Sequence, residues 1–215
     1  MPIEGAFDVY SSREAELERK NKELQAKIEA DKFDQMTGLS GGDHLLPKLE
    51  DLVKRLNSLE NKNTKDTPEK VMVIALDMND LKFFNDTYGH AGGNKALVAF
   101  ANRLRMVIKD VDFIFRHNKA GDEFMILLQI FKKDVDPEKI FKRIKEAVNT
   151  DLIIDLNGKK FSITSAMGYT MIEKGTSLTV EEIINNTDLE MYKDKERMKE
   201  EENNNHKNGS EDYSI

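Results

Sequence analysis

The chain has 215 residues, of which 39% are hydrophobic and 34% are charged, and its net charge at pH 7 is −7. This length suits one domain with appendages, the negative charge argues against nonspecific binding of nucleic acid, and the lack of cysteine excludes disulfides and thiolate metal sites. No apolar run is long enough to span a bilayer. We therefore expect a cytoplasmic protein with neither a nucleic-acid partner nor a membrane partner.

The N-terminal region divides into a tail and a helix. Residues 1–10 show no periodicity, whereas residues 11–33 are rich in Glu, Lys, Ala and Leu and contain neither Gly nor Pro. An a/d stripe with spacings of 4, 3 and 4 runs along this helix through Leu17, Asn21, Leu24 and Ile28. Two interpretations fit the stripe: the helix docks alone on the domain, or it forms a short parallel coiled coil whose register a buried Asn fixes.

The central region contains polar turns, β-rich runs and helical patterns. Asn157-Gly158 joins two of the β-rich runs and is a strong hairpin signal. We expect a turn at 34–43, helices at 44–59, 95–108, 137–148 and 180–200, a polar loop at 61–70, and strands at 71–76, 111–115, 124–130, 152–154 and 161–171. Residues 201–215 are rich in Asn and Glu, which predicts a disordered tail.

Three carboxylates are expected at the ends of neighbouring strands. Asp77 ends the run at 71–76, and Asp122 and Glu123 lie at the tip of the hairpin that the next two strands form. Carboxylates in these places can converge on one point, and hard cations such as Mg²⁺ prefer oxygen ligands, with phosphates completing the shell. The pattern therefore predicts a site for a divalent metal and phosphates. The alternative is that these acids are only polar strand ends.

Four motifs follow one another over most of the chain. Residues 34–39 (DQMTGL) are similar to D-x-L-T-G-L, and residues 77–94 are similar to D-x-D-x-F-K-x-x-N-D-x-x-G-H-x-x-G-D. Residues 120–124 (AGDEF) stand at the place of a G-G-D-E-F signature, and residues 188–195 are similar to A-D-x-A-L-Y-x-A-K. Together these motifs resemble the GGDEF domain, the diguanylate cyclase family.

The resemblance implies a fold and a reaction. The fold is an α+β palm, related to nucleotidyl cyclases and polymerases, in which helices flank a central, mainly antiparallel sheet. The domain would span residues 34–200, preceded by the N-terminal helix. The reaction is the condensation of two GTP into cyclic di-GMP with release of pyrophosphate. It would use two Mg²⁺ or Mn²⁺ ions per active site, and each subunit of a homodimer held by the N-terminal helix would carry one nucleotide.

The resemblance also implies the residues that perform the reaction. Asp77 and Asp122 match the metal-binding acids of the family, and the carbonyl of Met78 would be a further metal ligand. Asp122 matches the proposed base for the 3′-hydroxyl group. Glu123 is the adjacent acid of the signature, and it completes the expected catalytic set.

Five further residues match nucleotide-binding positions of the family. Lys82, on an expected turn after Asp77, and Lys195 would contact the triphosphate, and Lys199 stands where the family usually has Arg. Asn85 matches the asparagine that contacts the guanine edge. Asn94 stands where the family has the aspartate that reads guanine.

The sequence also departs from the family pattern. Asn94 and Ala120 replace an Asp and a Gly, and the inhibitory motif R-x-x-D appears as Lys109-x-x-Asp112, in which lysine lacks the bidentate fork of arginine. Three hypotheses follow: an active diguanylate cyclase, a cyclic-dinucleotide synthase with a relaxed choice between guanine and adenine, or a catalytically silent domain that binds nucleotide or protein.

Overall fold

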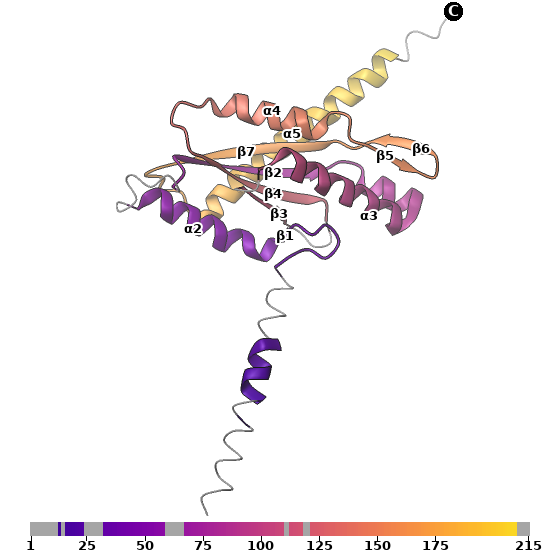
Figure 1. The fold of residues 1–215 in the computed structure, drawn as a ribbon. Helices are drawn as coiled ribbons and strands as arrows, with labels where there is room; N and C mark the ends of the chain where they lie inside the picture. Colours follow the sequence, from indigo (N-terminus) through magenta and orange to yellow (C-terminus); the bar gives the residue numbers. More distant parts are fainter. Residues whose placement is uncertain are drawn as a thin grey trace, which may run out of the picture.

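The computed structural model describes residues 13, 16–23, 32–58, 67–109, 112–117 and 121–209, without the side chains of residue 202 and residues 205–209. A five-stranded sheet with the order β1-β3-β4-β2-β7 forms its centre (Figure 1). Only β1 and β3 pair in parallel, and the other neighbours are antiparallel. The strands are β1 (Ser40–Gly41), β2 (Lys70–Met78), β3 (Phe113–Arg116), β4 (Glu123–Ile130) and β7 (Ser165–Glu173). The predicted α+β fold with a mainly antiparallel sheet is confirmed.

Helices cover both faces of the sheet (Figure 1). α3 and α4 pack on one face, and α2 and the first turns of α5 pack on the other. β2 is the strand between β4 and β7 and is buried on both faces, which explains why it reads as one continuous apolar run. The helices are η1 (Gly42–His44, a 3₁₀ turn), α2 (Leu45–Asn57), α3 (Leu81–Val107), α4 (Pro137–Asn149) and α5 (Val180–Gly209).

The region after β2 is more helical than expected. α3 begins at Leu81 and not at residue 95, so Lys82 lies in the first turn of a helix and the predicted turn is wrong. Gly89 interrupts this helix with φ 69° and ψ 176°, which divides it into two arms. Gly92 and Gly93 lie inside the helix and allow close packing: a Cβ atom at Gly93 would lie 2.1 Å from Oδ1 of Asn85.

The segment expected as one strand at 161–171 forms two. β5 (Ile153–Leu156) and β6 (Lys159–Ser162) make a separate hairpin, whereas β7 belongs to the main sheet. Asn157 and Gly158 have φ 57° and 81°, as a tight two-residue hairpin turn requires.

The structure describes only part of each end of the chain. α5 extends to Gly209, past its predicted end at residue 200. The prediction of disorder is therefore wrong for residues 201–209. Residues 210–215 and the predicted tail at 1–10 lie outside the described residues. Residues 16–23 are helical, as expected, but Leu24 and Ile28 of the predicted stripe lie outside the described residues. Among the described helices, none has a stretch both long and apolar enough to cross a membrane.

A buried ion pair joins the turn at residues 34–39 to the central sheet. Nη1 of Arg116, at the end of β3, donates to Oδ1 and Oδ2 of Asp34 at 3.1 and 3.2 Å, and the two side chains are only 2% and 9% exposed. Thr37 donates to the same carboxylate from its backbone N–H at 2.8 Å and from its hydroxyl at 2.6 Å. Nη2 of Arg116 also donates to the carbonyl of Gly121 at 3.0 Å, so this guanidinium holds the turn before β4 as well.

The surroundings of Asp34 determine its ionisation. Burial raises the pKa of its carboxyl, but the hydrogen bonds from Thr37 and the hydrogen bonds and charge of Arg116 outweigh burial and lower the pKa below its ordinary value. A carboxyl with a lowered pKa in the folded state stabilises the fold above its unfolded pKa, and this contribution is lost as the pH falls through the folded pKa.

Replacing Asp34→Asn should therefore destabilise the chain in a pH-dependent way. At neutral pH we expect a loss of about 3 kcal/mol, because Arg116 is left buried without its counter-charge. The loss should be full above about pH 4 and should shrink as the pH falls below the ordinary aspartate range. Urea unfolding at several pH values measures it, with Asp134→Asn at an exposed site as the control. A difference that does not change with pH would contradict this assignment.

Candidate active site

The register between β2 and β4 places the expected acids. Asp77 pairs with Glu123, and the N–H group of Met78 donates to the carbonyl of Asp122 at 3.0 Å. Asp77 and Asp122 therefore lie at the same end of two neighbouring strands, as the sequence predicted. Asp77 is only 8% exposed.

The two acids influence each other. Burial raises the pKa of the Asp122 carboxyl, and the negative charge of Asp77 raises it further. Two carboxylates held this closely repel one another, and a bound cation would relieve that repulsion. The pair therefore has the electrostatic character of a metal site.

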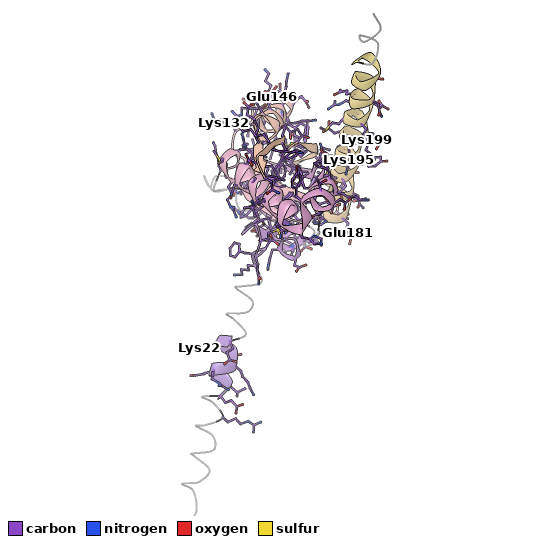
Figure 2. The ribbon with its side chains drawn as sticks, turned by 90° about the vertical axis from the view of Figure 1, so that its right-hand side faces the viewer. Lys22, Lys132, Glu146, Glu181, Lys195 and Lys199 are labelled. Carbon is purple, nitrogen blue, oxygen red and sulfur yellow. The ribbon has the colours of Figure 1, made fainter. Side chains whose placement is uncertain are left out.

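A lysine from the far end of the chain completes the cluster. Nζ of Lys195 on α5 donates to Oδ1 of Asp77 at 2.7 Å across 118 positions of sequence. Lys199 lies one turn further along the same helix, and Figure 2 shows the two lysines one after the other on α5. Lys199 is exposed and donates to Glu196 at 2.8 Å, and this hydrogen bond raises the pKa of Lys199.

These groups line a cleft of about 410 Å³ between the end of β2, the start of α3 and α5. Asp77 and Asp122 lie beside the lysines of its lining, which are Lys82, Lys195 and Lys199. The N-terminus of α3 opens into the same cleft, and helix N-termini bind phosphate through free N–H groups and the helix dipole. The cleft therefore combines groups for phosphate with groups for a cation.

The donor set in the cleft fits a hard cation. Within the described residues, no three His, Cys, Asp or Glu side chains gather in a way that could hold a metal alone. Two carboxylates and the carbonyl of Met78 are nevertheless the incomplete oxygen set that Mg²⁺ uses when substrate phosphates supply the other ligands. Asp77, Met78 and Asp122 fit such an ion.

Glu123 does not join the other acids. Glu123 lies directly opposite Asp77 in the register of β2 and β4, yet it lines a separate cavity of about 260 Å³ beside α5, with His117 and Asp188, and is absent from the lining of the acidic cleft. The expectation that Glu123 and Asp122 act at one point is therefore not met by this geometry.

The two candidate guanine-binding residues lie on the two arms of α3. Asn85 precedes the interruption at Gly89, is half-buried and packs against Gly93. Asn94 follows Gly93 directly and is exposed. The interruption thus brings the two asparagines close together, although neither lines the acidic cleft.

The candidate inhibitory residues lie just before β3, at the start of the β3–β4 hairpin. Asp112 is buried, and its Oδ1 accepts from the backbone N–H of Gln129 at 2.8 Å. The N–H group of Asp112 donates to the carbonyl of Lys109 at 3.0 Å, and the Lys109 side chain is exposed. Burial raises the pKa of the Asp112 carboxyl against the opposing effects of Gln129 and Lys109.

Two residues of the site were not singled out from the sequence. Arg116 fixes the turn before Asp122 through the carbonyl of Gly121, but its partner Asp34 is remote in sequence. Phe83 lines the cleft, whereas the adjacent Phe84 is buried. The two phenylalanines after Lys82 are visible in the sequence, but the sequence does not tell which of the two rings faces the core.

Comparison with known proteins finds similarity over most of the chain. Residues 31–201 match the family described as "Diguanylate cyclase, GGDEF domain". The probable diguanylate cyclase DgcJ of Escherichia coli is 36% identical over 115 residues, which are 52% of this chain and 21% of that protein. Diguanylate cyclase DgcP of Pseudomonas aeruginosa is 26% identical over 175 residues, which are 80% of this chain and 24% of that protein. The chain thus spans about a fifth of the length of these curated relatives.

A solved structure shows the same fold. The coiled coil and GGDEF domain of DgcB from Caulobacter crescentus, in complex with c-di-GMP, superposes with a TM-score of 0.69 at 18% identity and covers 89% of this chain and 94% of its own. The match to the family covers the sheet, the acidic cleft and most of α5. The chain therefore belongs to the diguanylate cyclase family of GGDEF domains.

Proposed function

We propose that this chain condenses two molecules of GTP into cyclic di-GMP and releases pyrophosphate. The observation that carries the proposal is the meeting of Asp77, Asp122 and Lys195 in one cleft at the N-terminus of α3. Acids, a lysine and a helix N-terminus in one place suit transfer of a nucleotidyl group from a triphosphate. The relatives named as diguanylate cyclases add the choice of substrate.

The reaction requires two identical displacements. The 3′-oxygen of each GTP forms a bond to the α-phosphorus of the other, and the bond from that phosphorus to the oxygen that bridges to the β-phosphate breaks. Asp122 accepts the proton of the attacking hydroxyl at its carboxylate. Lys195 and Lys82 neutralise charge on the triphosphate.

Asp77, Asp122 and the carbonyl of Met78 would hold two Mg²⁺ or Mn²⁺ ions. When bound, such ions supply charge stabilisation for the triphosphate and lower the pKa of the attacking hydroxyl. Asp77 and Lys195 are already paired in the protein alone, so both side chains are in place before the substrate arrives.

Replacing Asp77→Asn or Asp122→Asn should abolish most of the condensation. Each change removes a negative charge from the cleft with little change of shape, and the several kcal/mol supplied by metal-based stabilisation correspond to a loss of roughly a thousandfold in rate. The measurement is the rate of product formation from GTP, with the product identified by mass spectrometry and Asp134→Asn as the control. Near-normal rates in either variant would refute the assignment, and GTP binding without product in the unaltered chain would support a silent domain.

The base choice is a second point of the proposal. Aspartate accepts from both N1–H and N2–H₂ of guanine and repels N1 of adenine, whereas the Asn94 amide has one acceptor and one donor. Asn94 is exposed and follows Gly93, which packs against Asn85. Either the oxygen or the NH₂ group of its side-chain amide can therefore face the base. We therefore propose that GTP is preferred and ATP is partly admitted.

Competition between GTP and ATP tests this choice. Asn94→Asp should raise discrimination against ATP by roughly tenfold or more, because it restores a charge-assisted hydrogen bond of about 1.5–3 kcal/mol. The ratio of guanine to adenine in the cyclic products gives the readout. Equal ratios in the two proteins would show that Asn94 does not set the base choice.

We propose that two subunits face each other through the N-terminal helix. Leu17 lies on the helical residues 16–23 with 56% of its surface exposed, as an unpaired seam position would be in a single chain. The solved structure of DgcB also contains a coiled coil beside its GGDEF domain.

A charge on the seam should separate the subunits. Leu17→Asp should give monomers in sedimentation and a matching loss of condensation, since each product needs two nucleotides. Lys22→Asp, off the stripe on the same helix (Figure 2), is the control and should leave dimers intact. Active dimers of the Leu17 variant would overturn this mode of association.

A further inference from the structure

Asp194 is a buried carboxylate that the proposed reaction does not use. It lies on α5 directly before Lys195, and only 7% of its side chain is exposed. Lys145 of α4 and Arg197 of α5 both donate to its Oδ1 atom. The motif that residues 188–195 resemble has Ala at this position, so the resemblance does not explain an acid there. Burying a charge costs free energy unless partners compensate it, and the partners of Asp194 show what it holds in place.

The second oxygen of Asp194 accepts a hydrogen bond from the outer edge of the sheet. Oδ2 accepts from the backbone N–H group of Met167 at 2.9 Å. β7 has β2 on one side only, and the N–H groups along an edge strand point alternately toward the neighbouring strand and away from it. The N–H group of Met167 points away from β2, so Asp194 takes the place of a strand partner. This bond therefore fixes one point of α5 on the edge of β7.

α5 meets β7 backbone against backbone close to this point. A Cβ atom at Gly168 would lie 2.0 Å from the backbone N of Met191, so the helix lies directly against the strand with no side chain of Gly168 between them. Met191 lies three positions before Asp194 on α5. Interlocking side chains normally restrain how a helix rotates against its neighbour, and the contact at Gly168 lacks them. The hydrogen bond from Met167 to Asp194 therefore restrains the rotation of α5 here.

The same rotation places the ammonium group of Lys195. In the register of β2 with β7, Asp77 lies opposite Ala166, which directly precedes Met167. Asp194 and Lys195 are adjacent on α5, and they bond to adjacent positions of this ladder, at Met167 and at Asp77. Lys195 lines the acidic cleft, whereas Asp194 lines a groove between α4, β7 and α5. A rotation that broke the bond of Asp194 would therefore carry Lys195 away from the cleft.

We propose that Asp194 is a positioning residue, whose hydrogen bond to the edge of β7 holds Lys195 where it contacts the triphosphate of a bound nucleotide. This inference rests on the proposed function, in which Lys195 neutralises charge on the triphosphate. Asp194 touches neither substrate nor metal and acts through Lys195. Its hydrogen bond from Met167 sets the position, and its ion pairs with Lys145 and Arg197 compensate the buried charge.

The test separates the hydrogen bond of Asp194 from its charge. Asp194→Ala removes both, Asp194→Asn keeps an oxygen that can accept from Met167 but removes the charge, and Lys145→Met removes one ion pair alone. Water can enter the groove of about 1190 Å³ that Asp194 lines and can pair with the N–H group of Met167, so the alanine variant should fold. Asp194→Ser, whose hydroxyl is one bond shorter than the carboxylate, replaces it if it does not.

The probe is the α,β-methylene analogue of GTP, which cannot release pyrophosphate. Its dissociation constant is measured by calorimetry in the presence of Mg²⁺, and urea unfolding gives the stability of each variant. We expect the dissociation constant to rise roughly tenfold in Asp194→Ala, because the contact of Lys195 with phosphate is charge-assisted. Asp194→Asn and Lys145→Met should be less stable but should bind the analogue as the unaltered chain does. Unchanged binding in a folded Asp194→Ala variant, or an equal loss in Asp194→Asn, would overturn the positioning role.

Combination with Lys195→Met shows whether Asp194 acts through Lys195. In that background Asp194→Ala should cause no further loss of affinity, since the group that it positions is gone. Losses that multiply would overturn the proposal, because they would show a general effect of Asp194 on the fold. An unaltered chain that does not bind the analogue, or a Lys195→Met variant that binds it equally well, would refute the part of the proposed function on which this inference rests.

Discussion

The antiparallel register of β2 with β4 is the constraint on which the rest of the site depends. It sets Asp77 opposite Glu123 and brings Asp122 to the same end of the sheet. Because side chains alternate along a strand, a slip of one residue would turn Asp77 to the other face and away from the cleft. Burial of β2 on both faces, between α3 on one side and α2 on the other, makes such a slip costly.

Two further contacts fix the parts around this register. Arg116 ties the turn before Asp122 to Asp34, which follows the N-terminal helix in sequence. On the other side, Asp194 accepts from the N–H group of Met167 at 2.9 Å and from Lys145, which holds α5 on β7. Lys195 is the next residue, so the rotation of α5 that satisfies Asp194 also brings Lys195 to Asp77.

The sequence predicted the strand-end acids well because both signals are local: an apolar run, then a carboxylate. It failed where tertiary contacts decide. Glu123 adjoins Asp122, yet it lines a separate cavity and not the acidic cleft. A helix was expected only from residue 95, but α3 begins at Leu81, and within it only Gly89 leaves helical geometry. Lys195 and Asp77 are 118 positions apart, so no local sequence pattern predicts that they pair.

Strands and helices position different groups around the cleft. Carboxylates at strand ends are held by a hydrogen-bonded ladder, which suits groups that must keep a fixed distance to reacting atoms. Under the proposed function, contact with the nucleotide falls to the first arm of α3, where Lys82 and Asn85 lie three positions apart. Gly89 ends that arm and lets the second arm return Asn94 beside Asn85. A straight helix would separate positions 85 and 94 by about 13 Å along its axis, so the proposed reading of one base by both asparagines depends on this interruption.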